Sequence, residues 1–396
     1  MQITNAERKM WANTPNEPRT KLSDSEINAR YERGEGRIVV ENNREKLPGF
    51  VEQLKNGEYM DVRPFYQRRP RWDTTRQSRL IESFLINLPV PPVFLYEKAY
   101  NQYEVMDGQQ RISAVLDFFQ NRFPLKDLQH WPELNGRFYH NLPKLVKAGI
   151  DRRSISSIVM LKESAPEDEE ALFLRQIVFE RLNTGGVELE RQEIRNALFQ
   201  GELNDTLMRL SRHPVLRKAW GLPLYHKDEL TRRDPELMES AFFQKMEDVE
   251  LVLRFFALRN AKHYTRGMQG FLDLYMMKAS KLHNDDIHKL EDAFLNSIEV
   301  ADAIYRDKIF RPYASERGEW AGRPQKAFYD AIMVAISQNL SDRDLLIKRR
   351  LKVIKATEKL FDSAIEGAFT GRGNSKADII RRIELASDML KSVTSS

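Results

Sequence analysis

The segment YEVMDGQQRISAVLDFF, residues 103–119, is the most informative stretch of the chain. Its first four residues alternate in polarity, which predicts a short strand. The apolar residues that follow recur at the spacing of one helix face: Ile112, Val115, Leu116 and Phe119. Asp107–Arg111 therefore occupies a strand-to-helix turn. Free backbone N–H groups and the helix dipole favour an anion such as phosphate at this kind of turn.

The side chains of this turn suit a phosphate-containing ligand. Gly108 lets the backbone approach a ligand closely, and Arg111 offers a rigid fork of five donors to phosphate oxygens. Asp107 can hold a metal ion or orient a water. Gln109 and Gln110 do not titrate, but their amides can bond a base edge, a ribose or an attacking water. The alternative is a plain capped helix, with Asp107 near the N-cap and Arg111 solvated.

Two further polar blocks accompany DGQQR. Tyr66–Trp72 reads YQRRPRW, and Phe179–Gly186 reads FERLNTGG before Gln192–Ala197, QEIRNA. The three blocks, in this order, resemble the DGQQR-motif domains that form the N-terminal half of GmrSD-type restriction enzymes and part of SspE-type defence proteins. The resemblance spans roughly residues 52–199. It implies a fold related to the ParB and sulfiredoxin nucleotide-binding domains. It also implies that a nucleoside triphosphate is bound, and often hydrolysed, in a way that is coupled to nucleic-acid recognition.

The same resemblance implies a set of site residues. The arginine-rich block and DGQQR would line one pocket. Phosphoryl transfer needs a positive clamp, usually Mg²⁺, and a group that positions the nucleophile; Asp107, as the metal ligand, with Arg111 and Arg68 could supply that set if the blocks converge. The implied catalytic residues are Asp107, Gln110 and Arg111. The implied nucleotide-binding residues are Gln67, Arg68, Gly108, Gln109, Arg111, Asn183, Thr184, Gly185, Glu193 and Arg195.

Some of these residues have a structural alternative. Asn183–Gly186 is equally typical of a helix stop, with glycines supplying positive φ. Glu193 and Arg195 lie two positions apart and face different directions on one helix, so one of them can form a structural ion pair. Trp72 can stack on a base, although a core tryptophan anchoring the next helix is the favoured interpretation.

The pattern along the chain predicts an α+β protein in three parts. Residues 1–45 form a polar N-terminal segment, with a helix expected over 23–33. Residues 46–200 form a small mixed α/β, ParB/sulfiredoxin-like domain. The predicted strands are 90–96, 102–106 and 156–161, and the predicted helices are 76–88, 111–119, 167–182 and 190–200. Prolines at 89, 91 and 92 place the first of these strands at an edge or just after an entry point.

Residues 201–396 are expected to form an all-α helical domain. The long amphipathic stretches are 234–262, 268–281, 287–303, 326–340 and 342–366. Ser375 is expected to open a last helix, with Asp378 as its capping-box partner.

Composition sets the outer limits. The 396 residues are 41% hydrophobic and 31% charged, no window approaches the roughly 18 apolar residues of a membrane span, and the N-terminus does not have the pattern of a signal peptide. There is no cysteine, which excludes disulfides and thiolate zinc sites. A cytoplasmic protein that does not bind membranes is therefore expected. The net charge of +5 permits DNA binding without requiring it.

The missing motifs are equally informative. There is no P-loop motif, the seven histidines form no H-x-x-x-H pair, and the helical half lacks the histidine-centred nuclease motif of GmrSD-type enzymes. Three hypotheses follow. The favoured one is a triphosphate-binding and hydrolysing protein that couples nucleotide state to DNA or to a partner, such as a separate nuclease or effector, in anti-phage defence. The others are a metal-dependent nuclease using Asp107 and a nucleotide-independent DNA-binding adaptor. A homo-oligomer is compatible with each.

Overall fold

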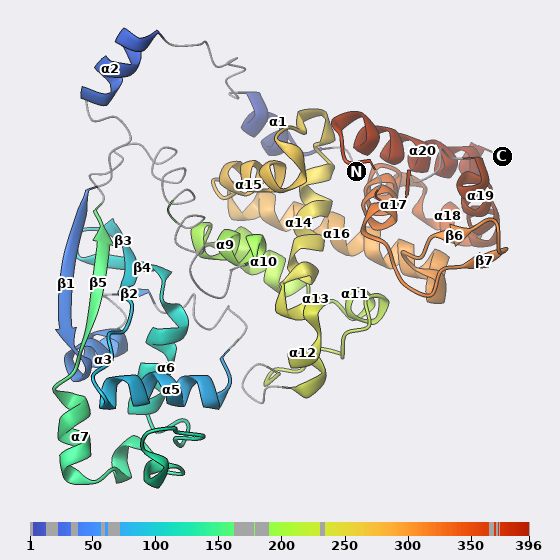
Figure 1. The fold of residues 1–396 in the computed structure, drawn as a ribbon. Helices are drawn as coiled ribbons and strands as arrows, with labels where there is room; N and C mark the ends of the chain where they lie inside the picture. Colours follow the sequence, from blue (N-terminus) through green and yellow to red (C-terminus); the bar gives the residue numbers. More distant parts are fainter. Residues whose placement is uncertain are drawn as a thin grey trace. The chain divides into compact units, whose positions relative to one another are not determined.

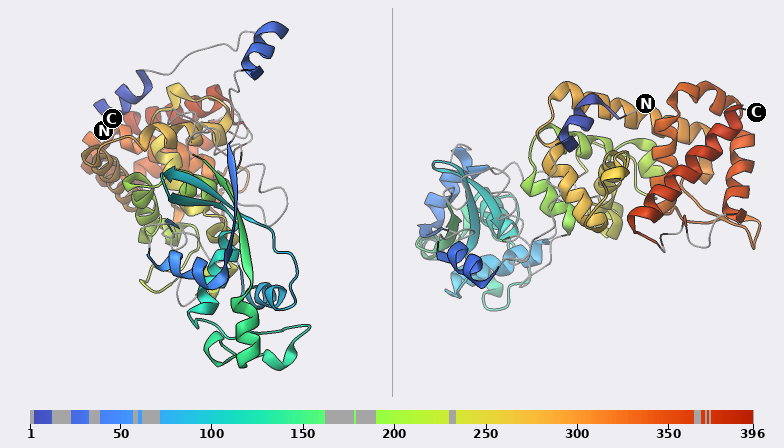
Figure 2. Two further views of the ribbon diagram at one scale, coloured as in Figure 1. Left: turned by 90° about the vertical axis from the view of Figure 1, so that its left-hand side faces the viewer. Right: turned by 90° about the horizontal axis from the view of Figure 1, so that it is seen from above.

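The computed structural model describes residues 3–12, 23–32, 39–56, 60–61, 72–161, 178, 190–229, 234–363, 368–369, 371 and 373–395 (Figures 1 and 2). The chain divides into two compact units. The sheet unit contains residues 17–189 and 196–198, and the helical unit contains residues 1–16, 190–195 and 199–396. The division passes through helix α9 (Arg191–Leu198).

The sheet unit is built on a five-stranded mixed sheet with the order β1-β5-β3-β4-β2. Both β1–β5 and β3–β4 are antiparallel, whereas β5–β3 and β4–β2 are parallel. The hairpin between β3 and β4 turns through Tyr100 and Asn101, and Asn101 has a φ of 59°. The strands are β1 (Val40–Lys46), β2 (Met60–Asp61), β3 (Val93–Ala99), β4 (Gln102–Asp107) and β5 (Ser154–Met160).

Helices α3 and α6 pack on this sheet, and α5 and α7 pack on those helices (Figure 1). Their apolar faces and the inner strand residues form one buried core, against which Trp72 packs. Trp72 therefore has the structural role favoured from the sequence. The helices and short 3₁₀ turns of this unit are α2 (Asp24–Glu32), α3 (Leu47–Asn56), α5 (Thr74–Leu85), α6 (Gln109–Phe119), η1 (Pro132–Leu134), η2 (Tyr139–Asn141) and α7 (Lys144–Asp151).

The prolines before β3 decide where this strand begins. The strand expected over 90–96 starts at Val93, immediately after Pro92, because proline cannot donate to a ladder. It is flanked by β5 and β4, so the edge position is wrong and the entry-point interpretation is correct.

The edge strands were missed. β1 reads VENNREK, with no buried residue and no apolar alternation, and β2 has only two residues.

The helical unit consists of helices of different lengths and one small two-stranded ribbon, so the expectation of an all-α domain holds apart from β6 and β7. The amphipathic stretch over 234–262 contains three α-helices, because Ser240 ends the first and caps the second, and Met246 adopts a φ of 55° before the third. The elements are α1 (Asn5–Ala12), α9, α10 (Glu202–Leu210), α11 (Pro214–Ala219), α12 (Pro235–Glu239), α13 (Ala241–Gln244), α14 (Glu247–Leu258), η5 (Ala261–His263), α15 (Gly267–Ala279), α16 (Asn284–Tyr305), η6 (Arg306–Lys308), β6 (Tyr313–Ala314), β7 (Glu319–Trp320), α17 (Lys326–Gln338), η7 (Leu340–Asp342), α18 (Arg343–Lys348), α19 (Arg350–Ser363) and α20 (Lys376–Ser395).

Two helices, α14 and α17, form the centre of the helical unit. Residues 248–258 of α14 and 327–337 of α17 are buried on every side, which identifies both as core helices. They are joined by polar groups as well as apolar ones. The Tyr329 hydroxyl donates to the Leu251 carbonyl at 3.0 Å, and Arg254 forms a bidentate ion pair with Asp330. These buried polar groups satisfy one another inside an otherwise apolar core.

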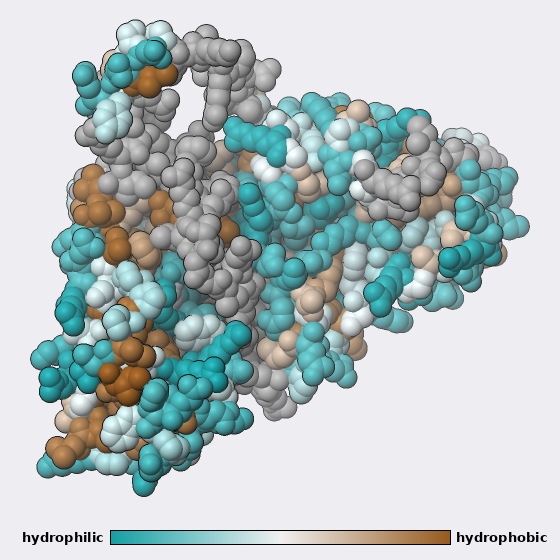
Figure 3. Space-filling view, viewed as in Figure 1, coloured by the Kyte–Doolittle hydropathy of each residue, from teal (hydrophilic) through white to brown (hydrophobic). Residues whose placement is uncertain are grey.

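On the face shown in Figure 3, the described surface of the helical unit is mainly hydrophilic, and patches of hydrophobic side chains are visible on the sheet unit. Exposed large apolar side chains of the sheet unit include Leu88, Tyr100 and Leu145. No helix among the described residues has both the length and the apolar character needed to cross a membrane.

Candidate functional site

The DGQQR motif lies at the junction between strand β4 and helix α6, as the sequence predicts. Val105 and Met106 are buried strand residues, the strand ends at Asp107, and the helix begins at Gln109. The N-cap is Gly108, in the left-handed conformation with a φ of 91°, and it has no side chain with which to cap the helix. Among the described residues, neither Asp107 nor another side chain is seen to accept a hydrogen bond from the first-turn amides of α6, as at helix ends that bind anions.

Gly108 is required here for two reasons. Its φ of 91° is rarely adopted by residues with a side chain. A Cβ atom at this position would also lie 2.6 Å from Cγ1 of Val93 and 2.9 Å from Nη2 of Arg111. The backbone thus passes directly against the first residue of β3 and against the arginine of the motif.

Arg111 and Asp107 form an ion pair across this glycine. Nη2 of Arg111 lies 2.7 Å from Oδ2 of Asp107 and 3.4 Å from the carbonyl oxygen of Pro92. The side chains are 16% and 32% exposed, so both are partly accessible and Arg111 is not simply solvated. Nε of Arg111 is buried and has no hydrogen-bond partner among the described residues. An incoming anion would compete with Asp107 for the guanidinium, and an incoming cation would compete with Arg111 for the carboxylate.

Gln109 is the least satisfied side chain of the motif. The residue is only 4% exposed, and within the described part of the chain neither its amide oxygen nor its amide nitrogen has a hydrogen-bond partner. Leaving a buried amide unpaired costs about 1–3 kcal/mol per group, and buried amides in folded proteins are nearly always paired. Such a side chain is a marker of a ligand site.

The other predicted pocket residues cannot be placed next to this junction. Gln67 and Arg68 of the arginine-rich block, and Asn183, Thr184 and Gly185 of the third block, lie outside the described residues. The convergence of the three blocks therefore stays a prediction. The structure does add Pro92 and Val93, which sequence reasoning missed because apolar residues at the start of a strand carry no functional signal.

The family comparison covers this whole region. Residues 48–200 match the family described as the GmrSD restriction endonuclease, N-terminal domain. This segment is similar to the N-terminal domain of GmrSD restriction endonucleases. It contains all three sequence blocks and accounts for less than half of the chain. The match associates the protein with restriction and defence. The comparisons with curated proteins and with solved structures give no match.

Glu193 falls within the matched GmrSD-type segment and has a clear local role. Its Oε2 accepts a hydrogen bond from the backbone N–H of Glu190 at 2.9 Å, and the Glu190 side chain accepts in return from the third helical residue. This capping box starts α9. The nucleotide contact implied for Glu193 stays a prediction.

Arg195 is engaged in the helical unit. Its guanidinium bonds Oδ1 of Asp273 at 2.6 Å, Oε1 of Gln192 at 3.1 Å, Oε2 of Glu250 at 3.4 Å and both oxygens of Gln269. The side chain is 1% exposed. Of the two roles that the sequence left open for Arg195, a structural ion pair is the one present in this structure. Apart from Gln192, three residues away, its partners lie 55 to 78 residues away in sequence, so no local pattern could reveal them.

Glu250 is the centre of that buried network. Burial alone would raise the pKa of its carboxyl, but the nearby positive charges of Arg195, Arg254 and Lys326 lower the pKa below its usual value. The carboxylate therefore stays charged at neutral pH.

Among the described residues no three His, Cys, Asp or Glu side chains are grouped so as to hold a metal ion.

Proposed function

We propose that the GmrSD-type domain binds a nucleoside triphosphate with Mg²⁺ at the β4–α6 junction, and that binding or hydrolysis controls how the chain engages DNA or a partner protein in defence. The observation that carries the proposal is Gln109, a buried amide without a partner beside an uncapped helix N-terminus. A nucleotide supplies both the anion that such a helix end favours and the polar edges that an amide can bond.

Each residue of the motif has a role in this proposal. Gly108 keeps the backbone free of a Cβ, so that phosphate can approach the first-turn amides. Arg111 clamps phosphate oxygens, and Gln109 and Gln110 bond the sugar, the base or the attacking water. Asp107 would hold Mg²⁺, which neutralises charge on the phosphates and polarises them.

Mg²⁺ at nucleotide sites is held by one or two carboxylates together with the phosphates of the substrate itself. Asp107, at the end of β4, would supply such a carboxylate.

The ion pair between Asp107 and Arg111 couples the two ligands. In the structure each side chain neutralises the other at 2.7 Å. Asp107 would hold Mg²⁺ only by giving up part of its ion pair with Arg111, which would free the guanidinium for phosphate, and phosphate on Arg111 would in the same way free Asp107 for Mg²⁺. Linkage then requires Mg²⁺ and triphosphate to strengthen each other's binding through this pair.

Equilibrium binding of ATP, GTP, CTP and UTP to the full-length protein, with and without Mg²⁺, tests the proposal. Arg111→Ala removes a charge-assisted phosphate contact worth about 1.5–3 kcal/mol, so a loss of at least about tenfold in affinity is expected. Asp107→Asn removes the internal competitor for Arg111. We expect it to bind triphosphate at least as tightly as the parent without Mg²⁺, and to lose the strengthening by Mg²⁺.

Two results would overturn the proposal. One is that no triphosphate binds the folded parent protein. The other is that Arg111→Ala binds as tightly as the parent while its circular dichroism spectrum is unchanged. Metal-dependent nicking of DNA that disappears in Asp107→Ala would instead support the nuclease hypothesis.

A further inference from the structure

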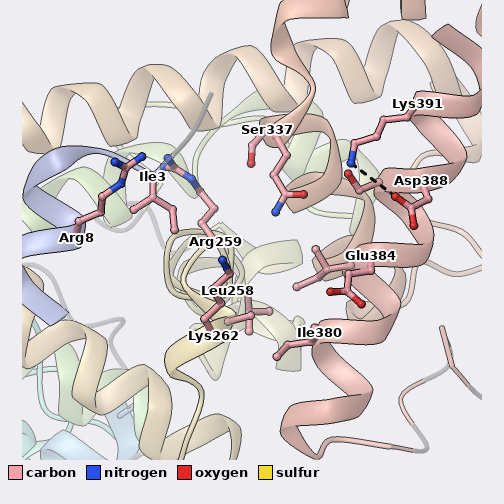
Figure 4. Close-up of a pocket in the computed structure, with 14 residues that line it drawn as sticks. Ile3, Arg8, Leu258, Arg259, Lys262, Ser337, Ile380, Glu384, Asp388 and Lys391 are labelled. Atoms are coloured by element: carbon pink, nitrogen blue, oxygen red, sulfur yellow. Dashed lines mark ion pairs between the residues drawn. The ribbon is translucent and has the colours of Figure 1, made fainter. Parts of the chain in front are cut away.

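The helical unit contains a pocket of about 550 Å³ that is unrelated to the DGQQR motif. It is lined by the start of the chain, by the end of α14 with η5, by the end of α17 and by one face of α20 (Figure 4). This volume is in the range of sites for small organic molecules. Its walls combine apolar residues such as Leu258 and Ile383 with several charged side chains.

Arg259 supplies a poorly compensated positive charge in this wall. Its side chain is 3% exposed, and its only ion pair among the described residues is Nη2 to Oε2 of Glu7 at 3.4 Å. Glu7 already accepts hydrogen bonds from Nδ2 of Asn260 at 3.0 Å and from the backbone N–H of Thr4 at 2.9 Å. Nη1 of Arg259 has no partner in the described part of the chain. A buried guanidinium with unused hydrogen-bond donors destabilises the folded state. It also attracts an anion, because the surrounding wall has a low dielectric constant.

Two further cations line the same pocket. Arg8 from α1 and Lys262 from η5 are exposed lining residues. The guanidinium groups of Arg8 and Arg259 lie at one end of the pocket, as Figure 4 shows. These three cations favour a dianion such as a phosphate monoester over a single carboxylate, whereas the fourth lining cation, Lys391, is paired with Asp388.

The opposite wall has a different character. Helix α20 presents Glu384 and the Asp388–Lys391 ion pair, whose charged atoms lie 3.6 Å apart (Figure 4). Glu384 and Asp388 can accept hydrogen bonds from hydroxyl or amino groups of a ligand. The pocket would match a ligand that has a phosphate at the arginine end, an apolar or flat body in the middle and hydrogen-bond donors at the α20 end.

We propose that this pocket binds a small organic phosphate, and that the ligand ties α1 to α14 and α20. The site lies wholly within the helical unit and does not depend on the proposed nucleotide site. Because the ligand would bridge elements from both ends of the chain, its binding stabilises the helical unit by mass action.

The test uses the full-length Arg111→Ala protein, so that binding at the DGQQR junction does not obscure the result. We compare three calorimetric titrations, with inorganic phosphate, with adenosine 5′-monophosphate and with uncharged adenosine. We expect saturable binding of the monophosphate, tighter than that of inorganic phosphate because of the apolar wall, and no binding of adenosine. Arg8→Ala and Lys262→Ala should each lower the affinity for the monophosphate by about two- to fivefold, as expected for the loss of a partly exposed charge contact.

Lys355→Ala is the matched control, because Lys355 is an exposed lysine of the same unit outside the pocket. It should bind like its parent. Absence of saturable binding by both phosphate probes would overturn the proposal. Equal affinities of the Arg8, Lys262 and Lys355 variants would also overturn it. Neither result bears on the nucleotide proposal, which is tested by Arg111 itself.

Discussion

Gly108 shows how much of the site a single residue can reveal. The sequence predicts a close approach of backbone to ligand at this glycine, and the positive φ is consistent with that prediction. The contact with Val93 could not be predicted, because it depends on β3 lying against the end of β4. The pairing of Asp107 with Arg111 was likewise not anticipated, although i and i+4 residues at a helix start can meet.

Gly108→Ala should destabilise the sheet unit for both reasons. The unfavourable φ costs about 1 kcal/mol, and the 2.6 Å contact with Val93 adds a clash, so a loss of about 2–3 kcal/mol is expected in urea denaturation. Gly136→Ala is the matched control. Gly136 has a φ of 81°, and a Cβ there meets nothing within 4 Å. Equal losses in the two variants would show that the contact with Val93 contributes nothing.

Glu82 gives a prediction about pH. Its buried carboxylate accepts hydrogen bonds from the backbone N–H groups of Gln129, His130 and Trp131 at 2.7 to 3.2 Å. Burial raises its pKa, but these three hydrogen bonds outweigh burial and lower the pKa below the ordinary 4.5. A lowered pKa in the folded state means that the stabilisation is present above pH 4.5 and is lost as the pH falls below it.

The free energy of unfolding should therefore decrease between pH 6 and pH 3.5, and Glu82→Gln should lose part of that dependence. Glu82→Gln should also be less stable at pH 7, because one neutral amide oxygen replaces a carboxylate that accepts three bonds. Denaturation curves at the two pH values measure both effects. An unchanged slope with pH in Glu82→Gln would contradict this role.

At the scale of elements, prediction succeeded where the apolar spacing was regular and failed where tertiary contacts determine the secondary structure. Strands β3, β4 and β5 and helices α5 and α6 lie within a few residues of their predicted bounds. The capping box of the last helix is confirmed, since Asp378 accepts from the Ser375 backbone N–H at 3.0 Å and its own N–H donates to Ser375 Oγ at 3.2 Å. The edge strand β1 was missed because its pairing with β5, and not its own sequence, stabilises it.

Helix α1 was also missed, since it has few apolar residues and lies in a segment expected to be polar. Its Trp11 explains why it is ordered. The ring stacks on His263 with centroids 4.7 Å apart, and its Nε1 donates to Oδ1 of Asn260 at 3.1 Å. These contacts attach the first residues of the chain to η5 and its neighbours.

Trp11→Ala should cost about 3–5 kcal/mol of helical-unit stability, the range for truncating a buried tryptophan. Trp11→Phe keeps an aromatic ring but loses the indole donor, so a smaller loss of about 1–3 kcal/mol is expected. Denaturant unfolding monitored by far-ultraviolet circular dichroism would measure both. If Trp11→Ala unfolds like the parent, α1 does not contribute to the stability of this unit.

At the scale of the whole molecule, the sequence indicated a mixed α/β part followed by a helical part, and both are present. The family match ends at residue 200 and leaves most of the helical unit outside it, so the role of this unit rests on its own structure. Its central feature is a buried charge network around Glu250 and Asp330. This network could not be predicted, because its members come from distant helices and look like ordinary surface charges in the sequence.

The most direct test of nucleotide function is phosphate release by the purified full-length protein from ATP, GTP, CTP and UTP with Mg²⁺, with and without DNA. Arg111→Ala is measured in parallel after its fold is verified by circular dichroism. Release by the parent that is lost in Arg111→Ala and altered by DNA is the predicted result. Equal release by the two proteins, or neither release nor binding of any triphosphate by the parent, would contradict the assignment of the DGQQR junction as a nucleotide site.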